Sequence, residues 1–495
     1  MTKGEKRGVS LNVAMVAKVI GWLLMIESVF MAFPMIASLI YGEMGCVKAF
    51  LMTIGITLFS GVLMTFGIHA QRTSMRTREG LLLTASVWVV LSVFGSLPFL
   101  FSGTLTSVVD AYFETMSGFS TTGITMIDNV ESAPHGILLW RSITQWLGGM
   151  GIILFTLAVL PMLNHTGGVQ LFNAEVTGIT HDKLRPRVSQ TATSLWVVYI
   201  VLTVVLFFLL WAGPMDFFDA LNHTLATTST GGFSTKNDSI AYWNSTYVIV
   251  VVGVFMFLCG MNFQLLYRFA KGDRKAVFKN DTFRWMTAYF LIIGIMVGIK
   301  VMLHSEPGER TNAFLSGIFQ TISAATSTGF SAFEHETYGG FVIYIFFIVM
   351  IFGASAGSTS GGAKIDRLVL LLKNTSIQIY HLMHPNTVKL IRINDKVVSD
   401  DVYAKAVAFL STYAMLVTVS GAILTLFGMP AFDAIFASLS AMSNIGLGCG
   451  VTGVDGSFTT LCDVSKSVLI FDMLAGRLEL FTVLIIFTRG FWKNN

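Results

Sequence analysis

Four short clusters of Ser, Thr and Gly recur along the chain, and each has the composition of a backbone turn that could bind a cation. Glycine adopts the positive φ that points successive carbonyls the same way, and small hydroxyl side chains leave those carbonyls accessible. Rings of carbonyl oxygens can replace the hydration shell of a monovalent cation. The glycines are accompanied by no ring of Asp or Glu, which argues against a site selective for a divalent ion.

Each cluster ends a longer pattern. An Asp-Ala pair at Asp110, Asp219 and Asp433 precedes the cluster glycine by 13, 12 and 13 residues, and the third cluster lacks the aspartate. The glycines (Gly123, Gly231, Gly329 and Gly446) are 108, 98 and 117 residues apart. Each follows an apolar stretch too short to cross a bilayer. One such cluster alone would favour an ordinary turn between helices, but four in register predict a repeated unit. The predicted unit is an outer helix, a short half-crossing helix, the turn and an inner helix.

The composition is that of a membrane protein. Of the 495 residues, 54% are hydrophobic and 12% are charged, about half of the roughly 25% charged residues usual in soluble domains. Mean hydropathy is +0.70. These values exclude a soluble enzyme or a nucleic-acid-binding protein. The four cysteines show no C-x-x-C spacing, which argues against a zinc site and a disulfide scaffold.

Long apolar runs predict ten membrane-spanning segments. With the N-terminus and the C-terminus in the cytoplasm, the inside segments hold 24 of the 32 Lys and Arg residues, as the positive-inside rule requires. The outer loops are acidic and would concentrate cations. The first run is too long for a signal peptide. The predicted spans are 15–41, 50–69, 81–102, 137–162, 192–213, 246–267, 284–303, 340–372, 403–428 and 465–488.

The half-crossing helices suit a cation path. Non-helical backbone is tolerated at membrane depth only inside protein or along a watery path. Each half-helix enters from the outside, so the negative end of its dipole points toward the membrane centre and favours a cation there. The predicted fold class is therefore an all-α polytopic membrane protein with four tandem helix–pore-loop–helix repeats around a pseudo-fourfold pore, preceded by two extra transmembrane helices.

Two stretches, WRSITQWLGGMGI (140–152) and NHTLATTSTGGFST (222–235), together with the four glycine-centred turns, resemble the Trk/Ktr/HKT superfamily of potassium transporters. The two spans before the first repeat make the bacterial TrkH branch the nearer one. The resemblance implies K⁺ uptake across the bacterial inner membrane by a homodimeric pore subunit. It also implies a cytosolic TrkA-type regulatory partner that binds NAD(H) or adenine nucleotides.

The resemblance further implies which residues bind the ion. The fourth turn departs from the others because Asn-Ile replaces Ser-Thr. Each motif is also shorter than the TVGYG filter of potassium channels, so we expect looser discrimination between K⁺ and Na⁺. The implied ligands are Thr121, Thr122 and Gly123; Ser229, Thr230 and Gly231; Ser327, Thr328 and Gly329; and Asn444, Ile445 and Gly446.

The segment FGASAGSTSGGAK (352–364) interrupts an apolar run with four glycines and, between its first and last residues, no large side chain. Each glycine disfavours helix by about 1 kcal/mol relative to Ala. The segment is not a phosphate-binding loop, since Ala363 separates Gly362 from Lys364 and no strand precedes it. A small-residue helix-packing face is the plainer alternative. The resemblance implies an intramembrane gate formed by Gly353, Gly357, Ser358, Thr359, Ser360, Gly361 and Gly362.

Arg477 lies within the last predicted span, where an ionised side chain is costly and usually functional. A purely structural pair with Asp472 or Glu479 is the alternative. The resemblance matches Arg477 to the family's pore arginine below the filter, where it would set an electrostatic barrier or anchor the carbonyls of the gate.

The expected function is gated, channel-like K⁺ flux, and the alternative is an H⁺- or Na⁺-coupled K⁺ symporter. The spans carry no motif of an intramembrane enzyme. The polar segment 373–405, together with 268–284, is the expected docking surface for a cytosolic partner, or else only the charge that the positive-inside rule requires. The expected divisions are 1–80 (two-helix region), 81–190, 191–283, 284–400 (with the gate) and 401–495 (pore repeats 1 to 4).

Overall fold

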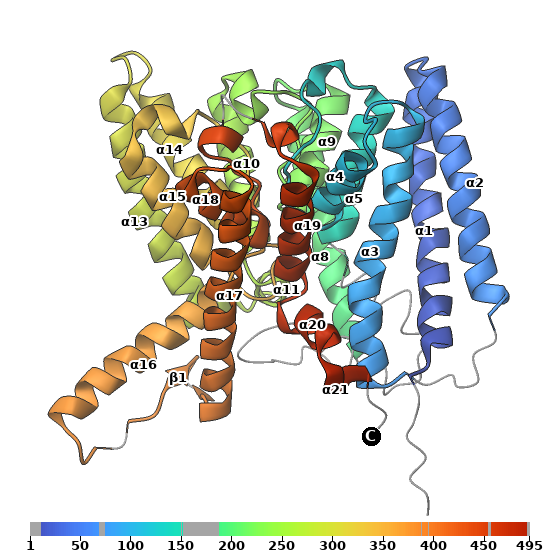
Figure 1. Ribbon diagram of the computed structural model, residues 1–495. Coiled ribbons are helices and arrows are strands. Elements are labelled where there is room, and N and C mark those ends of the chain that lie inside the picture. The colour runs from blue at the N-terminus through green and yellow to red at the C-terminus, as the bar shows by residue number, and fades with distance from the viewer. Residues whose placement is uncertain are drawn as a thin grey trace, which may run out of the picture.

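A computed structural model describes residues 11–68, 75–149, 151, 188–387, 389–394, 396–453 and 457–492. The described chain is mostly helical and forms one bundle of upright helices (Figure 1). In this part of the chain the only strands are β1 (Arg392–Ile393) and β2 (Lys396–Val397), a short antiparallel pair beyond the lower end of the bundle. The structure thus agrees with the predicted all-α class.

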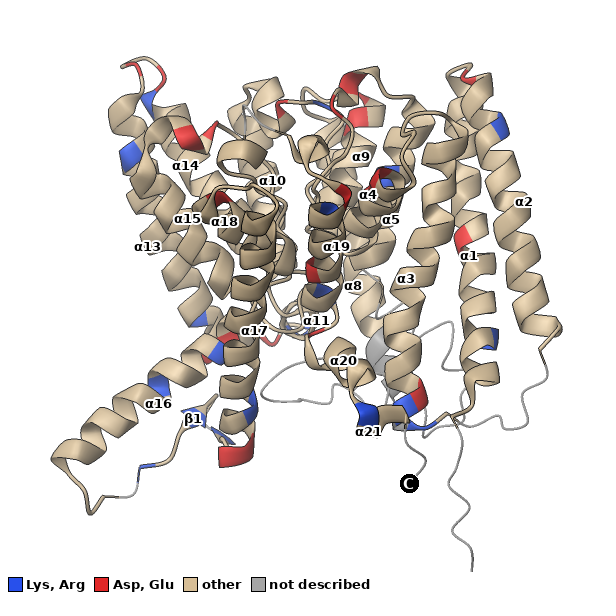
Figure 2. Cartoon of the chain, viewed as in Figure 1, with Lys and Arg blue, Asp and Glu red and all other residues tan. Residues whose placement is uncertain are grey.

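Six described helices are long and apolar enough to cross a bilayer, and a bent pair of shorter helices makes a seventh. Figure 2 shows that most charged residues lie toward the two ends of the bundle and few in its middle. The two spans predicted before the first repeat correspond to the first two of these helices. The six are α1 (Val13–Ile40), α2 (Met44–Phe66), α3 (Thr77–Phe101), α8 (Val188–Trp211), α13 (Asp281–His304) and α17 (Asp400–Leu426).

Four shorter helices each stand immediately before one of the Ser/Thr-Gly clusters. Three have 12 residues and one has 16. At 1.5 Å per residue they are about 18–24 Å long, less than the roughly 30 Å of a bilayer core. Their last turns are buried in the bundle. They are α4 (Val108–Phe119), α9 (Phe217–Thr228), α14 (Arg310–Ala325) and α18 (Ala431–Met442).

Two predicted spans are not single straight helices. The predicted span 246–267 is broken into α10 (Thr246–Gly260) and α11 (Phe263–Ala270), which bend by 105°. The side chain of Asn262 caps α11, so the break has a local cause. The predicted span 465–488 ends as a regular helix at Arg477, because Glu479 and Leu480 have φ of 52° and 27°. Such left-handed backbone does not continue a right-handed helix.

The remaining helices complete the bundle and its lower end. Part of the predicted span 137–162 and residues 164–187 of the predicted inside segment 164–191 lie outside the described residues, as does Asp455 in a predicted outer loop. The predicted interruption of 340–372 is present, between α15 and α16. These helices are α5 (His135–Gly149), α12 (Arg274–Phe278), α15 (Gly340–Phe352), α16 (Ile365–Met383), α19 (Asp463–Arg477), α20 (Phe481–Leu484) and α21 (Arg489–Trp492).

Glycines let α4 and α5 cross closely. A Cβ on Gly148 would lie 1.9 Å from the carbonyl oxygen of Phe119, the last residue of α4. A Cβ on Gly118 would lie 2.2 Å from the hydroxyl of Thr144 on α5. Because backbone cannot yield as a flexible side chain can, the crossing requires glycine at position 148.

We expect Gly148→Ala to lower the thermal unfolding midpoint of the purified protein in detergent. Overpacking of this kind costs about 1–3 kcal/mol. Gly45→Ala on α2 is the control, since a Cβ there meets nothing within 4 Å and alanine favours helix. If the two variants unfolded at the same temperature, the close crossing would not be required.

Candidate functional site

The four turns share one backbone conformation. Each helix ends at a cap residue, the next residue has φ between 53° and 57°, and a glycine two positions later has φ between 79° and 84°. A residue with a side chain is strained in this region, whereas glycine is not. The first positions are Thr121, Thr230, Ser327 and Asn444, and the glycines are Gly123, Gly232, Gly329 and Gly446.

The second turn therefore has a register one residue later than predicted. Ser229 is the C-cap of α9, and Gly231 occupies the middle position rather than the glycine position. The glycine of the second turn is Gly232, which was not among the predicted residues. The sequence carried a signal for it, because Asp219 precedes Gly232 by 13 residues, the spacing found in the first and fourth clusters. Because Gly231 and Gly232 are adjacent, composition alone did not indicate which of them is the turn glycine.

The turns contact one another in a closed cycle. A Cβ built on the glycine of one turn would meet a carbonyl of another turn at 1.9–2.3 Å in every case. In each case the carbonyl belongs to the middle residue of that turn. No side chain larger than a hydrogen fits at these four positions. The contacts are Gly123 to Gly231, Gly232 to Thr328, Gly329 to Ile445 and Gly446 to Thr122.

The hydroxyl side chains hold the turns. The Thr122 hydroxyl lies 2.7 Å from that of Ser120, and the Thr328 hydroxyl lies 2.8 Å from that of Thr326. The carbonyl of Gly231 accepts a hydrogen bond from Gln145 on α5. The other three middle carbonyls accept no hydrogen bond from the described residues. Their oxygens are available to a ligand.

A large cavity opens on one side of the turns. It has a volume of about 680 Å³, and all four turn glycines line it. Its charged lining is mixed. Asp238 and Glu334, two of the acidic residues predicted to face the outside, line it together with Asp128, Arg141 and Lys236. A hydrated cation can therefore reach the four turns from this cavity.

The other side of the turns is covered by the interrupted segment between α15 and α16. Gly353, Gly357, Gly362 and Lys364 have φ between 64° and 77°, so the backbone here is a loop. The break between α10 and α11 anchors it: Ser355 N–H donates to the Gly260 carbonyl, and the Asn262 amide donates to the Ala356 carbonyl.

The centre of this loop contacts three of the turns. The hydroxyls of Thr359 and Thr230 are 3.2 Å apart, and the N–H of Gly361 donates to the Ser327 hydroxyl at 2.6 Å. A Cβ on Gly361 would lie 2.2 Å from the Ser443 carbonyl. The Ser327 hydroxyl in turn donates to that of Ser360.

Not every predicted residue of the loop reaches a turn. Ser358 donates to the Ser355 carbonyl within the loop, and Gly357 lies against Asn262. These two residues shape the loop and its anchor. The predicted gate residues therefore form one segment with two kinds of contact, one kind to the turns and one kind to the break in the α10–α11 pair.

Arg477 holds the loop from a different helix. At the end of α19, its guanidinium donates to the Thr359 carbonyl at 2.9 Å and to the Gly148 carbonyl at 2.7 Å. Asp472, a predicted alternative partner, instead accepts hydrogen bonds from Ser420 and Ser438. Arg477 therefore contacts the backbone of the loop between α15 and α16.

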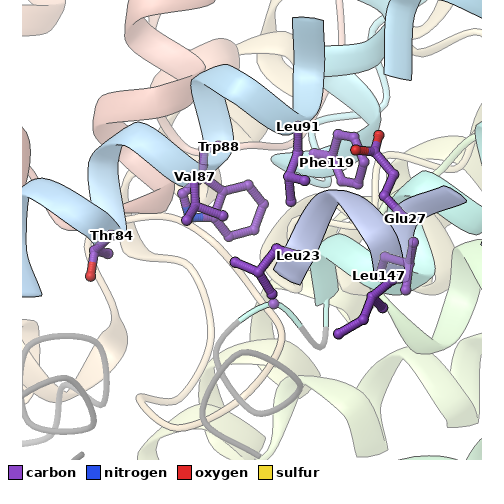
Figure 3. A pocket seen from close by; sticks show the side chains of 10 residues that line it. Leu23, Glu27, Thr84, Val87, Trp88, Leu91, Phe119 and Leu147 are labelled. Carbon is purple, nitrogen blue, oxygen red and sulfur yellow. The ribbon is translucent and has the colours of Figure 1, made fainter. Parts of the chain in front are cut away.

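A second pocket, of about 50 Å³, lies between α1, α3, α4 and α5 (Figure 3). Its lining is apolar apart from Glu27, Thr84 and the indole of Trp88. The Glu27 carboxylate is buried and has no hydrogen-bond partner among the described residues. This pocket offers a cation far fewer oxygen atoms than the four turns do, so the turns are the candidate site.

Comparison with known proteins gives a consistent result. The family model TrkH, described as cation transport protein, matches residues 47–492. The "Trk system potassium uptake protein TrkH" of Escherichia coli K12 is 34% identical, over 97% of this chain and 99% of its own. TrkG of the same organism is 32% identical over 98% and 99%. The crystal structure of the potassium transporter TrkH from Vibrio parahaemolyticus matches with a TM-score of 0.87 and 31% identity, over 98% of this chain and 100% of that one.

Proposed function

The chain belongs to the TrkH family of cation transport proteins, and from this premise we propose that it conducts potassium into the cell through a gated, channel-like pore. The relatives are named as potassium uptake proteins and potassium transporters, not as enzymes. The closed cycle of four glycine turns is the observation that carries the proposal.

The turns act as the selectivity filter of a pseudo-fourfold pore built from four repeats. Each middle carbonyl lies against the glycine of another turn, and each short helix ends at its turn, so that its negative dipole end faces the ion. Three of those carbonyls have no hydrogen-bond donor among the described residues. Neutral oxygens in this arrangement suit a monovalent cation that has lost its water.

The loop 353–364 is the gate of this pore. It touches turns two, three and four on the side opposite the large cavity. Arg477 fixes it by a hydrogen bond to the Thr359 carbonyl. Flux requires this segment to move away from beneath the turns, and the glycines at 353, 357 and 362 allow such a change of backbone.

The protein resides in the bacterial inner membrane with both termini in the cytoplasm, as a homodimer. Figure 1 shows α16 and the β1–β2 hairpin extending beyond the lower end of the bundle. The segment 373–405 carries Lys373, Lys389, Arg392, Lys396 and Lys405. It is the docking surface for a cytosolic TrkA-type subunit that binds NAD(H) or adenine nucleotides.

Uptake of ⁸⁶Rb⁺ into liposomes that contain the purified protein tests the function. We expect uptake driven by an outward K⁺ gradient, and a reversal potential that follows the K⁺ gradient alone. If the reversal potential moved with an imposed H⁺ or Na⁺ gradient, the coupled symporter would be favoured instead. Protein-free liposomes give the background uptake. If the protein gave no uptake above this background, both the channel and the symporter would be refuted.

A further inference from the structure

One position in each short helix faces the segment that leaves the turn. It lies nine residues before the turn glycine and is occupied by Glu114, His223, Gln320 and Ala437 in chain order. All four residues are buried. Three of them carry polar side chains, although the preceding and following helical turns are largely apolar or small. Buried polar groups of this kind are kept where they have partners.

The partners occupy matching places. Glu114 accepts a hydrogen bond from the N–H of Met126 at 2.6 Å, three residues after the turn glycine. Gln320 accepts one from the N–H of Ala332 at 2.9 Å, again three residues after the glycine. The same contact thus recurs in the first and third turns, with a carboxylate in one and an amide in the other.

The second turn uses a neighbouring contact. His223 Nε2 lies 3.0 Å from the hydroxyl of Ser234, two residues after Gly232. Thr125, two residues after Gly123, likewise donates its hydroxyl to Glu114. Each of the three polar side chains therefore ties the outgoing segment back to the helix that enters the same turn. We call this position the brace.

The fourth turn has no brace, because the methyl group of Ala437 makes no hydrogen bond. Its outgoing segment is contacted from elsewhere: His335 Nε2 lies 3.0 Å from the carbonyl of Gly448, two residues after Gly446. This turn is also the one in which Asn444 and Ile445 replace hydroxyl residues. The fourth turn therefore lacks both the brace and the hydroxyl residues.

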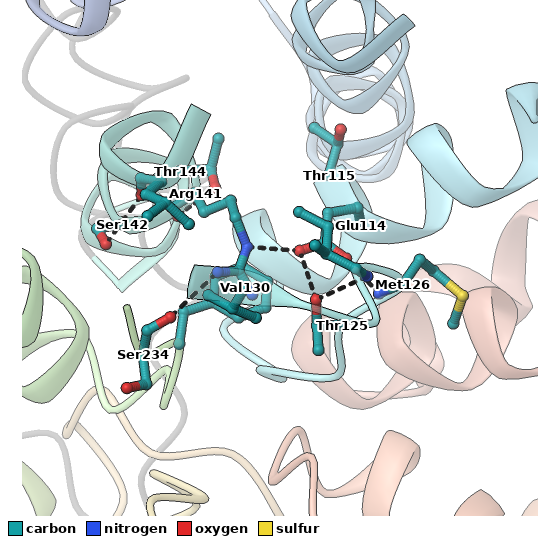
Figure 4. Close-up of polar contacts among 12 residues, drawn as sticks. Glu114, Thr115, Thr125, Met126, Val130, Arg141, Ser142, Thr144 and Ser234 are labelled. Atoms are coloured by element: carbon teal, nitrogen blue, oxygen red, sulfur yellow. Dashed lines mark hydrogen bonds and ion pairs between the residues drawn. The ribbon is translucent and has the colours of Figure 1, made fainter. Parts of the chain in front are cut away.

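Arg141 on α5 extends the first brace to the second turn (Figure 4). Its Nε donates to Glu114 Oε1 at 2.6 Å, and its Nη1 donates to the Ser234 carbonyl at 3.2 Å. The guanidinium lies 4.1 Å from the ring centre of Phe233. Only 2% of the Arg141 side chain and none of the Glu114 side chain is exposed. One ion pair thus spans the outgoing segments of two adjacent turns.

We infer that Glu114 and Arg141 are positioning residues that set the spacing of the first and second turns, and that Gln320 does the same within the third turn. The inference deepens the proposed function, because it assigns these residues a part in discrimination between K⁺ and Na⁺. Arg141 lines the large cavity, but the hydrogen bonds of these side chains go to the outgoing segments and not to the middle carbonyls of the turns. They fix the backbone that carries those carbonyls.

A purely structural role makes a different prediction. A buried ion pair that loses one partner leaves an uncompensated charge and destabilises the fold, whereas removal of both partners is far less damaging. Stability would then recover in the double variant, and selectivity would recover with it. A positioning role predicts recovery of stability alone, since the two outgoing segments remain untied.

The test compares Glu114→Met, Arg141→Met and the double variant in liposomes, with the ratio of ⁸⁶Rb⁺ to ²²Na⁺ uptake and the thermal unfolding midpoint as readouts. We expect the uptake ratio to fall about tenfold in both single variants and to stay low in the double variant, as the loss of a charged hydrogen bond implies. The unfolding midpoint should fall in the single variants and rise again in the double variant. A wild-type uptake ratio in the double variant would overturn the inference.

Gln320→Met tests the brace without a buried charge. It removes the bond to the Ala332 N–H, and we expect a lower uptake ratio here as well. Asn312→Met near the start of the same helix is the matched control, since its side chain is exposed and accepts a hydrogen bond from the Thr246 hydroxyl rather than from the outgoing segment of the turn. Equal ratios for the two variants would overturn the inference. If wild-type protein took up no ⁸⁶Rb⁺, the proposed function would fail instead.

Discussion

Gly329→Ala is expected to remove most of the preference for K⁺ over Na⁺ while leaving a folded protein. The added Cβ would lie 1.9 Å from the Ile445 carbonyl, one of the oxygens proposed to bind the ion. The backbone at Gly329 also has φ of 81°, which an alanine adopts only with strain. Either the third turn or the fourth must shift. A shift costing about 1–3 kcal/mol in ion binding corresponds to a roughly 5- to 150-fold change in relative affinity.

The measurement is the ratio of ⁸⁶Rb⁺ to ²²Na⁺ uptake in liposomes. Gly428→Ala is a closely matched control, because Gly428 has φ of 94° but a Cβ there meets nothing within 4 Å. It carries the backbone strain without the contact. We expect its uptake ratio to equal that of the wild type. Should Gly329→Ala keep the wild-type ratio, the turns would not be the filter.

Arg477→Met should increase K⁺ flux about tenfold in the absence of any regulatory subunit. The substitution removes the hydrogen bonds to the Thr359 and Gly148 carbonyls, and bonds from a charged donor contribute about 1.5–3 kcal/mol each. Loss of one such bond from the closed arrangement shifts the gate toward the open one by roughly that amount. Methionine keeps much of the length of the side chain, so the packing of α19 is largely preserved.

Initial rates of ⁸⁶Rb⁺ uptake measure this effect, with the amount of folded protein fixed by size-exclusion chromatography. Lys405→Met serves as the control, since its ion pair with Asp401 is exposed and lies on α17 away from the loop. Flux at or below the wild-type rate in folded Arg477→Met protein would show that the arginine does not hold the gate closed.

Local composition predicted a structural element wherever one short segment had to meet a physical requirement by itself, such as crossing the bilayer or adopting positive φ. The apolar runs predicted α1, α2, α3 and the other long helices, because a bilayer admits little else of that length. The four glycine clusters predicted the turns, since few residues adopt positive φ without strain. The loop between α15 and α16 was visible as a glycine-rich interruption of an apolar run.

Register and breaks were harder to predict. The Gly231-Gly232 pair offered two positions of equal composition, and only the φ angles and the contact with Thr328 selected Gly232. The bend of α10 at Asn262 was missed for a similar reason. An asparagine in an apolar run does not by itself predict a break in the helix. The hydrogen bond from the Asn262 amide to the Ala356 carbonyl is seen only in the folded structure.

The sequence by itself determined that this chain is a membrane protein with four glycine turns, and its resemblance pointed to Arg477 as the residue below them. Only the tertiary structure decided that the turns meet in a cycle, that Arg477 binds the Thr359 carbonyl and that Glu114 is paired with Arg141. Helices and turns follow from short-range sterics and from the surrounding lipid. The partner of each buried polar group depends on how helices far apart in the chain pack together. The residue pattern along one segment does not predict that packing.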